Sequence, residues 1–154
     1  MYAKNAKNIK IEDNTISSIS IASEGGDLIY ISNTRTGDLN VALSRNVINF
    51  MSTPYSNKAL KIEGSNSNEK AHIIVESLFL NTNTYVTSTS NTIANSVFKG
   101  LGGVWYIYSQ TYSNTYKTEF VDSGSTYTET ISLYGSVLAC VMCTKISFTS
   151  STFS

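Results

Sequence analysis

The chain has 154 residues, of which 41% are hydrophobic and only 14% charged, and its eleven basic and eleven acidic side chains leave no net charge. A chain of this length is expected to form a single domain, residues 1–154, whose core needs no disulfide or metal support. The absence of net charge excludes a global field that would attract nucleic acid or an acidic membrane, and it favours self-association.

Polarity in this chain is carried by hydroxyl and amide groups. Ser, Thr and Asn supply 57 of the 154 residues, and these types suit strands and turns more than exposed helices. Ten Tyr, six Phe and one Trp argue against disorder. The composition therefore predicts a folded, all-β domain.

The first third of the chain shows period-two alternation. The N-terminus lacks both the apolar core of a signal peptide and an apolar run long enough to span a membrane. Residues 8–12 alternate as a strand does, and residues 17–22 and 28–31 flank the turn-like residues 24–27. The latter pattern predicts a β-hairpin.

The middle of the chain mixes strand signals with ambiguous segments. Residues 39–43 and 59–64 are expected to be short strands, and residues 44–50 could form one short helix before Pro54. Residues 69–80 favour a strand, with a helix as the alternative. Residues 81–95, rich in Ser, Thr and Asn, are expected to form an exposed strand or a long loop.

The last third is enriched in β-branched and aromatic residues. Strands are predicted at residues 85–89, 104–108, 116–121 and 127–134. Turn signals recur every 8–12 residues, which is typical of a sandwich or barrel, and no internal repeat is evident. We expect an antiparallel β-sandwich or jelly roll with about ten short strands and little helix.

Candidate catalytic groups are few. His72 is the single histidine and lies in an apolar run, so it is expected to be a structural strand residue. Glu119 and Glu129 could form a glycosidase pair, but alternating strands supply such pairs by chance. Residues 99–103 lack the spacing of a phosphate-binding loop and predict a turn or bulge. We expect no enzymatic activity, no catalytic residues and no cofactor.

Cys140 and Cys143 lie inside the apolar run of residues 137–148. If this run is one buried strand, residues three apart point to opposite faces and cannot share a metal or a disulfide. We therefore expect two reduced, inert core thiols, a reducing compartment and no metal site.

The aromatic residues that follow residue 103 form the best candidate contact surface. They are Trp105, Tyr106, Tyr108, Tyr112 and Tyr116. Tyr and Trp combine apolar faces with a polar edge, so such a patch serves a protein interface or a sugar-stacking platform, and core packing is the alternative.

Together these features predict a structural subunit of a virion or comparable particle, such as a capsid-decorating, head–tail connecting or fibre domain. Such a homo-oligomeric subunit would be made in the host cytoplasm and would contact copies of itself and other structural proteins, without nucleic acid or membrane. The alternative is a carbohydrate- or receptor-binding β-sandwich module that uses the aromatic patch, and a small β-fold enzyme is the least favoured class.

Overall fold

The computed structural model describes residues 1–17, 28–49, 73–78, 82–95, 97–101, 103–110, 115–134 and 137–154. Several sequence predictions fall outside these residues: the strand at residues 59–64, the hairpin turn at residues 24–27, His72 and Tyr112. The described residues contain seventeen strands and no helix, so the all-β prediction is confirmed. In this part of the chain there is accordingly no helix that could cross a bilayer.

Fifteen of the strands form three five-stranded sheets. Sheet A contains β1 (Tyr2–Lys4), β4 (Ile29–Asn33), β7 (Ile73–Ser77), β11 (Trp105–Ser109) and β15 (Leu138–Val141). Sheet B contains β2 (Asn8–Glu12), β5 (Leu39–Ser44), β8 (Thr84–Thr89), β12 (Thr118–Ser123) and β16 (Lys145–Thr149). Sheet C contains β3 (Thr15–Ser17), β6 (Val47–Asn49), β9 (Thr92–Ala94), β13 (Thr126–Thr128) and β17 (Thr152–Phe153).

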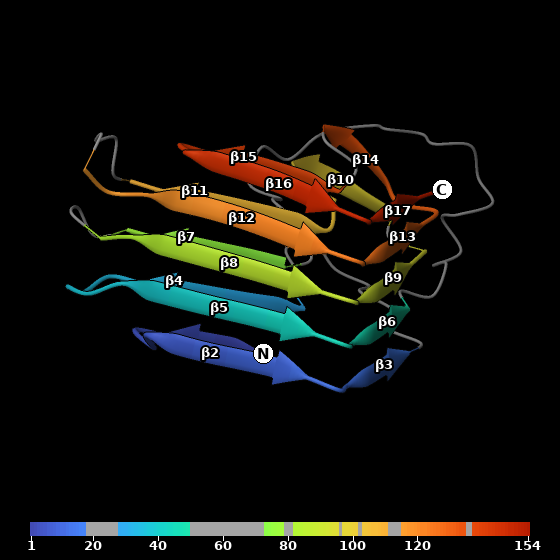
Figure 1. Ribbon diagram of the computed structural model, residues 1–154, viewed down its shortest axis with the longest axis horizontal. Helices are drawn as coiled ribbons and strands as arrows, with labels where there is room; N and C mark the ends of the chain where they lie inside the picture. The colour runs from blue at the N-terminus through green and yellow to red at the C-terminus, as the bar shows by residue number, and fades with distance from the viewer. Residues whose placement is uncertain are drawn as a thin grey trace.

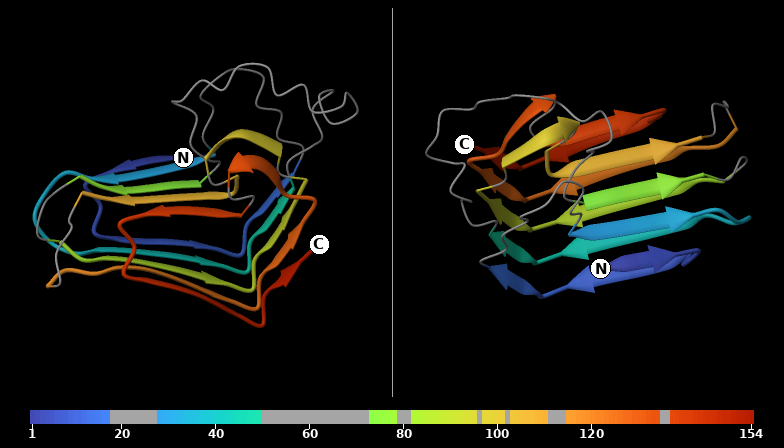
Figure 2. Two further views of the ribbon diagram at one scale, coloured as in Figure 1. Left: turned by 90° about the horizontal axis from the view of Figure 1, so that it is seen from above. Right: turned by 180° about the vertical axis from the view of Figure 1, so that it is seen from behind.

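The chain visits sheets A, B and C in turn and then returns to sheet A, so each circuit is one coil and the five coils stack (Figure 1). We number these coils 1 to 5 from the N-terminus. All strand pairs between successive coils are parallel and in register. Seen down the stack, sheets A and B face each other and sheet C closes one side (Figure 2). This is the architecture of a parallel β-solenoid.

A further two-stranded parallel sheet, β10 (Val97–Leu101) with β14 (Ile131–Tyr134), stands outside the coil cross-section (Figure 2). Its register shifts between Phe98 and Leu101, and Gly103 in the following turn has a φ of 54°. The turn or bulge predicted at residues 99–103 is therefore confirmed.

The predicted antiparallel sandwich or jelly roll is wrong, because every strand pair in the described residues is parallel. A solenoid strand buries one face and exposes the other, as a sandwich strand does, so the alternation alone does not separate the two folds. The predicted hairpin is also wrong. Both edges of β4 are occupied, by β1 on one side and β7 on the other, and Ser17 of β3 pairs with Asn49 of β6.

Left-handed backbone conformations turn the chain from sheet B into sheet C. The equivalent corner residues of the five coils are Asp13, Arg45, Ser90, Gly124 and Ser150, with φ between 51° and 67°. Asn, Asp and Gly tolerate this conformation best, and a single residue in it makes a sharp corner without ending the sheet on either side.

The next residue in three successive coils is asparagine, and these form a hydrogen-bonded ladder. The Asn14 backbone N–H donates to Oδ1 of Asn46 at 3.1 Å, and the Asn46 N–H donates to Oδ1 of Asn91 at 2.9 Å. The Asn91 N–H then donates to Oγ of Ser125 at 3.2 Å. Asn46 and Asn91 are each 1% exposed, so the ladder satisfies the backbone where water does not reach.

The space between the sheets is filled by the inward side chains of every second strand residue. One inward column of each sheet, in coils 2 to 4, consists of Ile31, Val75 and Ile107 in sheet A, Val41, Val86 and Phe120 in sheet B, and Ile48, Ile93 and Tyr127 in sheet C. Each is at most 1% exposed. In-register stacking of like residues thus gives one continuous apolar column for each sheet.

Several local predictions are settled by the strands. Residues 44–49 form no helix, because β5 ends at Ser44 and Val47–Asn49 is β6, and Phe50 lies outside the described residues. The strand favoured within residues 69–80 is confirmed at β7. Residues 82–95 form strands β8 and β9 in the central coil, and each strand has one exposed face and one face buried by Val86, Ser88 or Ile93.

Candidate contact surfaces

The structure divides the predicted aromatic patch between two faces of β11. Trp105 points inward and is fully buried, where its ring meets Phe120 edge-on with centroids 5.3 Å apart. Tyr106 and Tyr108 point outward from sheet A and pack in a separate cluster with Tyr30. Tyr106 is only 7% exposed, Tyr108 is half-buried and Tyr116, before β12, is half-buried.

The outer face of sheet A, defined by Tyr2, Tyr30, Glu76, Tyr106 and Tyr108, is the first candidate surface. Tyr2 is 69% exposed and stacks on Tyr30 with ring centroids 5.2 Å apart. The Tyr30 hydroxyl donates to Oε2 of Glu76 at 2.7 Å. Burial, followed by this hydrogen bond and the Glu76 charge, raises the pKa of Tyr30 to about 12, so the hydroxyl remains a donor at neutral pH.

The last described coil differs from its sequence prediction. Residues 137–148 are not one buried strand, because β15 ends at Val141 and β16 begins at Lys145. Met142, between the two strands, has a φ of 62°, so the chain turns a corner there. The prediction failed because the residues on both sides of the corner are apolar, so the hydrophobic pattern does not show where one strand ends and the next begins.

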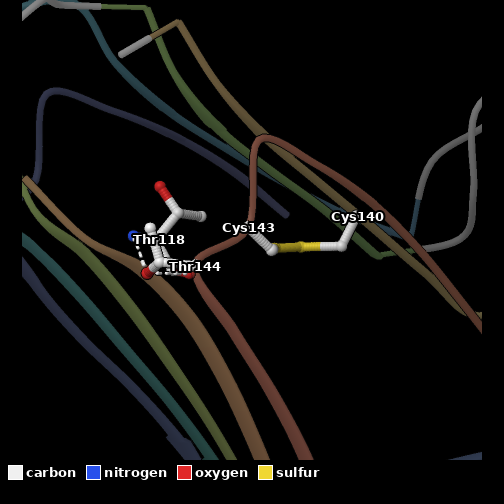
Figure 3. The surroundings of a disulfide bond; sticks show 4 residues. All are labelled: Thr118, Cys140, Cys143 and Thr144. Carbon is white, nitrogen blue, oxygen red and sulfur yellow. Dashed lines mark hydrogen bonds between the residues drawn. A yellow bond between two sulfur atoms is a disulfide. The ribbon is translucent and has the colours of Figure 1, made fainter. Parts of the chain in front are cut away.

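Because of this corner, Cys140 and Cys143 lie on the same side and form a disulfide, with Cα atoms 5.8 Å apart (Figure 3). This separation falls within the usual range for disulfides. The predictions of opposite-facing cysteines and of two reduced thiols are therefore wrong. Since disulfides persist mainly in oxidising surroundings, the cysteines no longer support a reducing compartment.

Coil 5 exposes its inward positions, and this is the second candidate surface. Ile146, Phe148 and Phe153 occupy the register positions of Phe120, Asp122 and Tyr127 in the coil before. Those three residues are fully buried, whereas Ile146 is 51%, Phe148 37% and Phe153 51% exposed. We call these three side chains the coil 5 apolar end. No coil within the described residues lies over it (Figure 1).

Coil 1 contains a cavity of about 480 Å³ at the opposite end of the stack. Its lining residues are Met1, Lys10, Ile11, Glu12, Asn14, Ile16, Leu28 and Ile29. Ile11 and Ile16 occupy the inward register positions of coil 1, in the same columns as Leu43 and Ile48. The cavity is therefore the unfilled end of the apolar columns.

The buried carboxylate of Asp122 is held in structural contacts. Asp122 is buried and accepts hydrogen bonds from Tyr127 Oη at 2.7 Å and from Ser151 Oγ. Burial raises the pKa of the Tyr127 phenol, so it acts as a donor. Glu119 lies on β12, whereas Glu129 follows β13 at a corner with a φ of 51°.

No group of three acidic, histidine or cysteine side chains suited to a metal occurs in the part of the chain that the structure describes. Comparisons with known protein families, with curated proteins and with solved structures gave no match for this chain. The candidate surfaces are thus defined by the fold and its exposed side chains. At coil 5, the apolar run of residues 137–148 was expected as an alternative contact segment, and it contains Ile146 and Phe148 but not Phe153.

Proposed function

We propose that this chain is a non-enzymatic structural subunit of a virion or comparable particle and that it works through protein–protein contacts made by the ends of its coil stack. The observation that carries the proposal is the exposure of the coil 5 apolar end, where Ile146, Phe148 and Phe153 occupy positions that are buried in every inner coil. Solenoids require terminal coils with a polar outer face to remain apart in solution.

The strand edges of coil 5 support the same proposal. An uncovered parallel edge offers backbone N–H and C=O groups that another strand can pair with, and proteins usually protect such edges with charged residues. The three strands of coil 5 carry one charged residue, Lys145. We propose that a second copy of this chain covers this end, because its own first coil presents apolar positions in matching columns.

Binding of a carbohydrate by the outer face of sheet A is a second candidate. The stacked pair of Tyr2 and Tyr30 favours it, because exposed aromatic faces stack on sugar rings. Tyr106 on the same face is nearly covered, which leaves a small platform.

Sedimentation velocity over a range of concentrations tests the structural proposal. We expect the wild type to associate and the variant Ile146→Lys/Phe153→Lys to sediment as a monomer, since edge lysines oppose strand pairing. The matched control is Val47→Lys/Leu78→Lys, because Val47 and Leu78 are 44% and 39% exposed on inner coils. The control should associate as the wild type does.

Equal association by both lysine variants would contradict the proposal. A glycan array supplies the opposing readout: binding of a glycan by a monomeric wild type, with loss of that binding in Tyr2→Ala, would favour the carbohydrate-binding function instead.

A further inference from the structure

The two ends of the stack present matching columns of side chains. Ile146, Phe148 and Phe153 of coil 5 share their columns with Ile9, Ile11 and Ile16 of coil 1. In sheet A, Cys140 shares its column with Ala3. If the next coil above coil 5 were coil 1 of another copy, each of these four inward positions would meet an apolar side chain.

The backbone gives the stack a direction. At the corner between sheets B and C, each N–H donates to the carbonyl of the next coil: Asp13 to Ser44, Arg45 to Thr89, Ser90 to Ser123 and Gly124 to Thr149, at 2.8–3.1 Å. Ser150 occupies the same corner position, with a φ of 54°, so its N–H points out of the coil 5 end.

The equivalent acceptor at the other end is the carbonyl of Glu12, which shares its column with Ser44. This carbonyl already accepts one hydrogen bond from Nδ2 of Asn14 at 2.9 Å, and a carbonyl oxygen has a second lone pair for another donor. Coil 5 thus offers a donor where coil 1 offers an acceptor. Two coil 5 ends brought together would oppose donor to donor at this corner, which leaves both N–H groups unpaired.

The exposed rings of coil 5 and the unfilled space at coil 1 lie in the same columns. The rings of Phe148 and Phe153 meet edge-on at the coil 5 end, with centroids 5.3 Å apart. The cavity of about 480 Å³ at coil 1 is lined by Ile11 and Ile16, which are the residues in the same columns as these two rings. Continued stacking therefore directs the exposed rings toward the unfilled end.

The outward charges do not oppose this arrangement. In the continued register Lys145 meets Asn8, Ser147 meets Lys10 and Thr149 meets Glu12. No like-charged pair is brought together among these positions, and Val141 meets Lys4 on sheet A.

From these observations we infer that copies of this chain stack head to tail, with coil 5 of one copy covering coil 1 of the next as a continuation of the same three parallel sheets. The inference rests on the proposed function and specifies its partner, its orientation and its register. The contact joins two different surfaces and continues the stack along its own axis, so it does not close into a ring and it generates an open filament.

Cysteine pairs across the predicted junction test the register. Lys10→Cys and Ser147→Cys would face each other on the outer side of sheet B, where the side chains are not part of the core. We expect a mixture of the two single variants, oxidised with the native Cys140–Cys143 pair intact, to give a disulfide-linked dimer. Lys10→Cys mixed with Thr149→Cys is the matched control, because an offset of two residues separates the Cα atoms by about 8 Å, too far for a disulfide.

Several outcomes would overturn the inference. Ser147→Cys bridging to itself would show contact between two coil 5 ends, and equal bridging by matched and offset pairs would show no fixed register. If the wild type associates through Ile146 and Phe153 but the matched pair does not bridge, head-to-tail stacking fails while the structural role stands. If the wild type does not associate at any concentration, both fail.

Discussion

The buried amides of the corner ladder show how single polar residues stabilise this fold. Asn91 accepts hydrogen bonds from the N–H of Asn46 and donates to the carbonyl of Leu43 at 3.0 Å and to Oγ of Ser88 at 3.0 Å. The residue is 1% exposed, so water cannot replace these partners.

Asn91→Ala is expected to lower the free energy of unfolding by about 3 kcal/mol, because the buried Asn46 N–H and Leu43 carbonyl lose their partners. Asn14→Ala, at the exposed end of the same ladder, should cost less than about 1 kcal/mol. Denaturant unfolding measures both values. Equal losses of unfolding free energy in the two variants would show that the buried hydrogen bonds of the ladder stabilise the fold no more than the exposed ones do.

Tyr30 makes the stability of the folded protein depend on pH, and the direction follows from its raised pKa. Its pKa is raised in the folded protein from 10.0 to about 12, so the folded state holds its proton more tightly than the unfolded state. The resulting stability is complete below pH 10 and is lost as the pH rises from about 10 to about 12.

Tyr30→Phe should therefore flatten the decline in unfolding free energy over that pH interval. Tyr116→Phe is the control, because Tyr116 is half-buried outside the sheet A face. Unfolding by denaturant at a series of alkaline pH values measures the slope, and an unchanged slope in Tyr30→Phe would contradict the assignment.

At the scale of residues, the sequence identified which side chains are distinctive and not where they point. Trp105 and Tyr106 are neighbours in an aromatic run, and only the strand register separates the buried ring from the outward one. Asn46 lies in the segment considered for a short helix and Asn91 in the segment expected to be an exposed strand or loop, whereas their observed role depends on stacking between residues 45 positions apart.

At the scale of elements, the alternation predicted several strands well. β2 matches its predicted residues 8–12, and β5, β8, β11 and β12 lie within one or two residues of theirs. Strand pairing was not predictable, because alternation reports that one face is buried and does not report the partner. One left-handed residue makes a corner inside each of two segments that were predicted as single strands. Met142 divides residues 137–148, and Glu129 divides residues 127–134 into β13 and β14, and such a residue is not distinctive in the sequence.

Substitutions at Ser90 test whether a left-handed residue turns the chain at the corner between sheets B and C. Ser90 is exposed and has a φ of 51°, a conformation that costs a β-branched residue about 1–2 kcal/mol. Ser90→Val should lower the unfolding free energy by about that amount, whereas Ser90→Gly should leave it unchanged or raise it by up to about 1 kcal/mol. Thermal or denaturant unfolding measures the pair, and equal effects of Val and Gly would contradict a left-handed corner.

The disulfide is expected to act locally on coil 5. Cys140–Cys143 closes a loop of three residue steps, for which chain entropy predicts a stabilisation of about 2 kcal/mol. The same corner is held by Thr144, whose Oγ1 accepts from the Thr118 N–H at 3.1 Å (Figure 3).

Cys140→Ser/Cys143→Ser should therefore speed hydrogen exchange in β15 and β16 and leave β7 and β8 unchanged. Exchange followed by mass spectrometry measures this difference. Two free thiols in the unfolded, unreduced wild type would show that the pair is not formed.

At the scale of the whole molecule, the repeat was hidden by unequal coil lengths. Stacked partners are separated by 32, 45, 34 and 26 residues in successive coils, so no fixed period runs through the chain. Solenoids are normally recognised from such a period. The all-β class was therefore predictable from composition, and the coiled topology was not.

Head-to-tail stacking predicts the dimensions of the assembly. Each copy adds five coils, and neighbouring parallel strands lie about 4.7–4.9 Å apart, so the axial rise per copy should be about 24 Å. Electron microscopy of wild-type filaments measures this rise. A rise unrelated to the coil spacing would mean that the copies meet through another surface.

Hydrogen exchange at low and high protein concentration tests most directly whether the open ends of the coil stack are the working surfaces. Head-to-tail stacking predicts that raising the concentration protects the amides of β15, β16 and β17 together with those of β1, β2 and β3, and leaves the inner coils unchanged. Ile146→Lys/Phe153→Lys should abolish that gain. Protection that arises instead on the outer face of sheet A, or no change at any amide of coils 1 and 5, would contradict it.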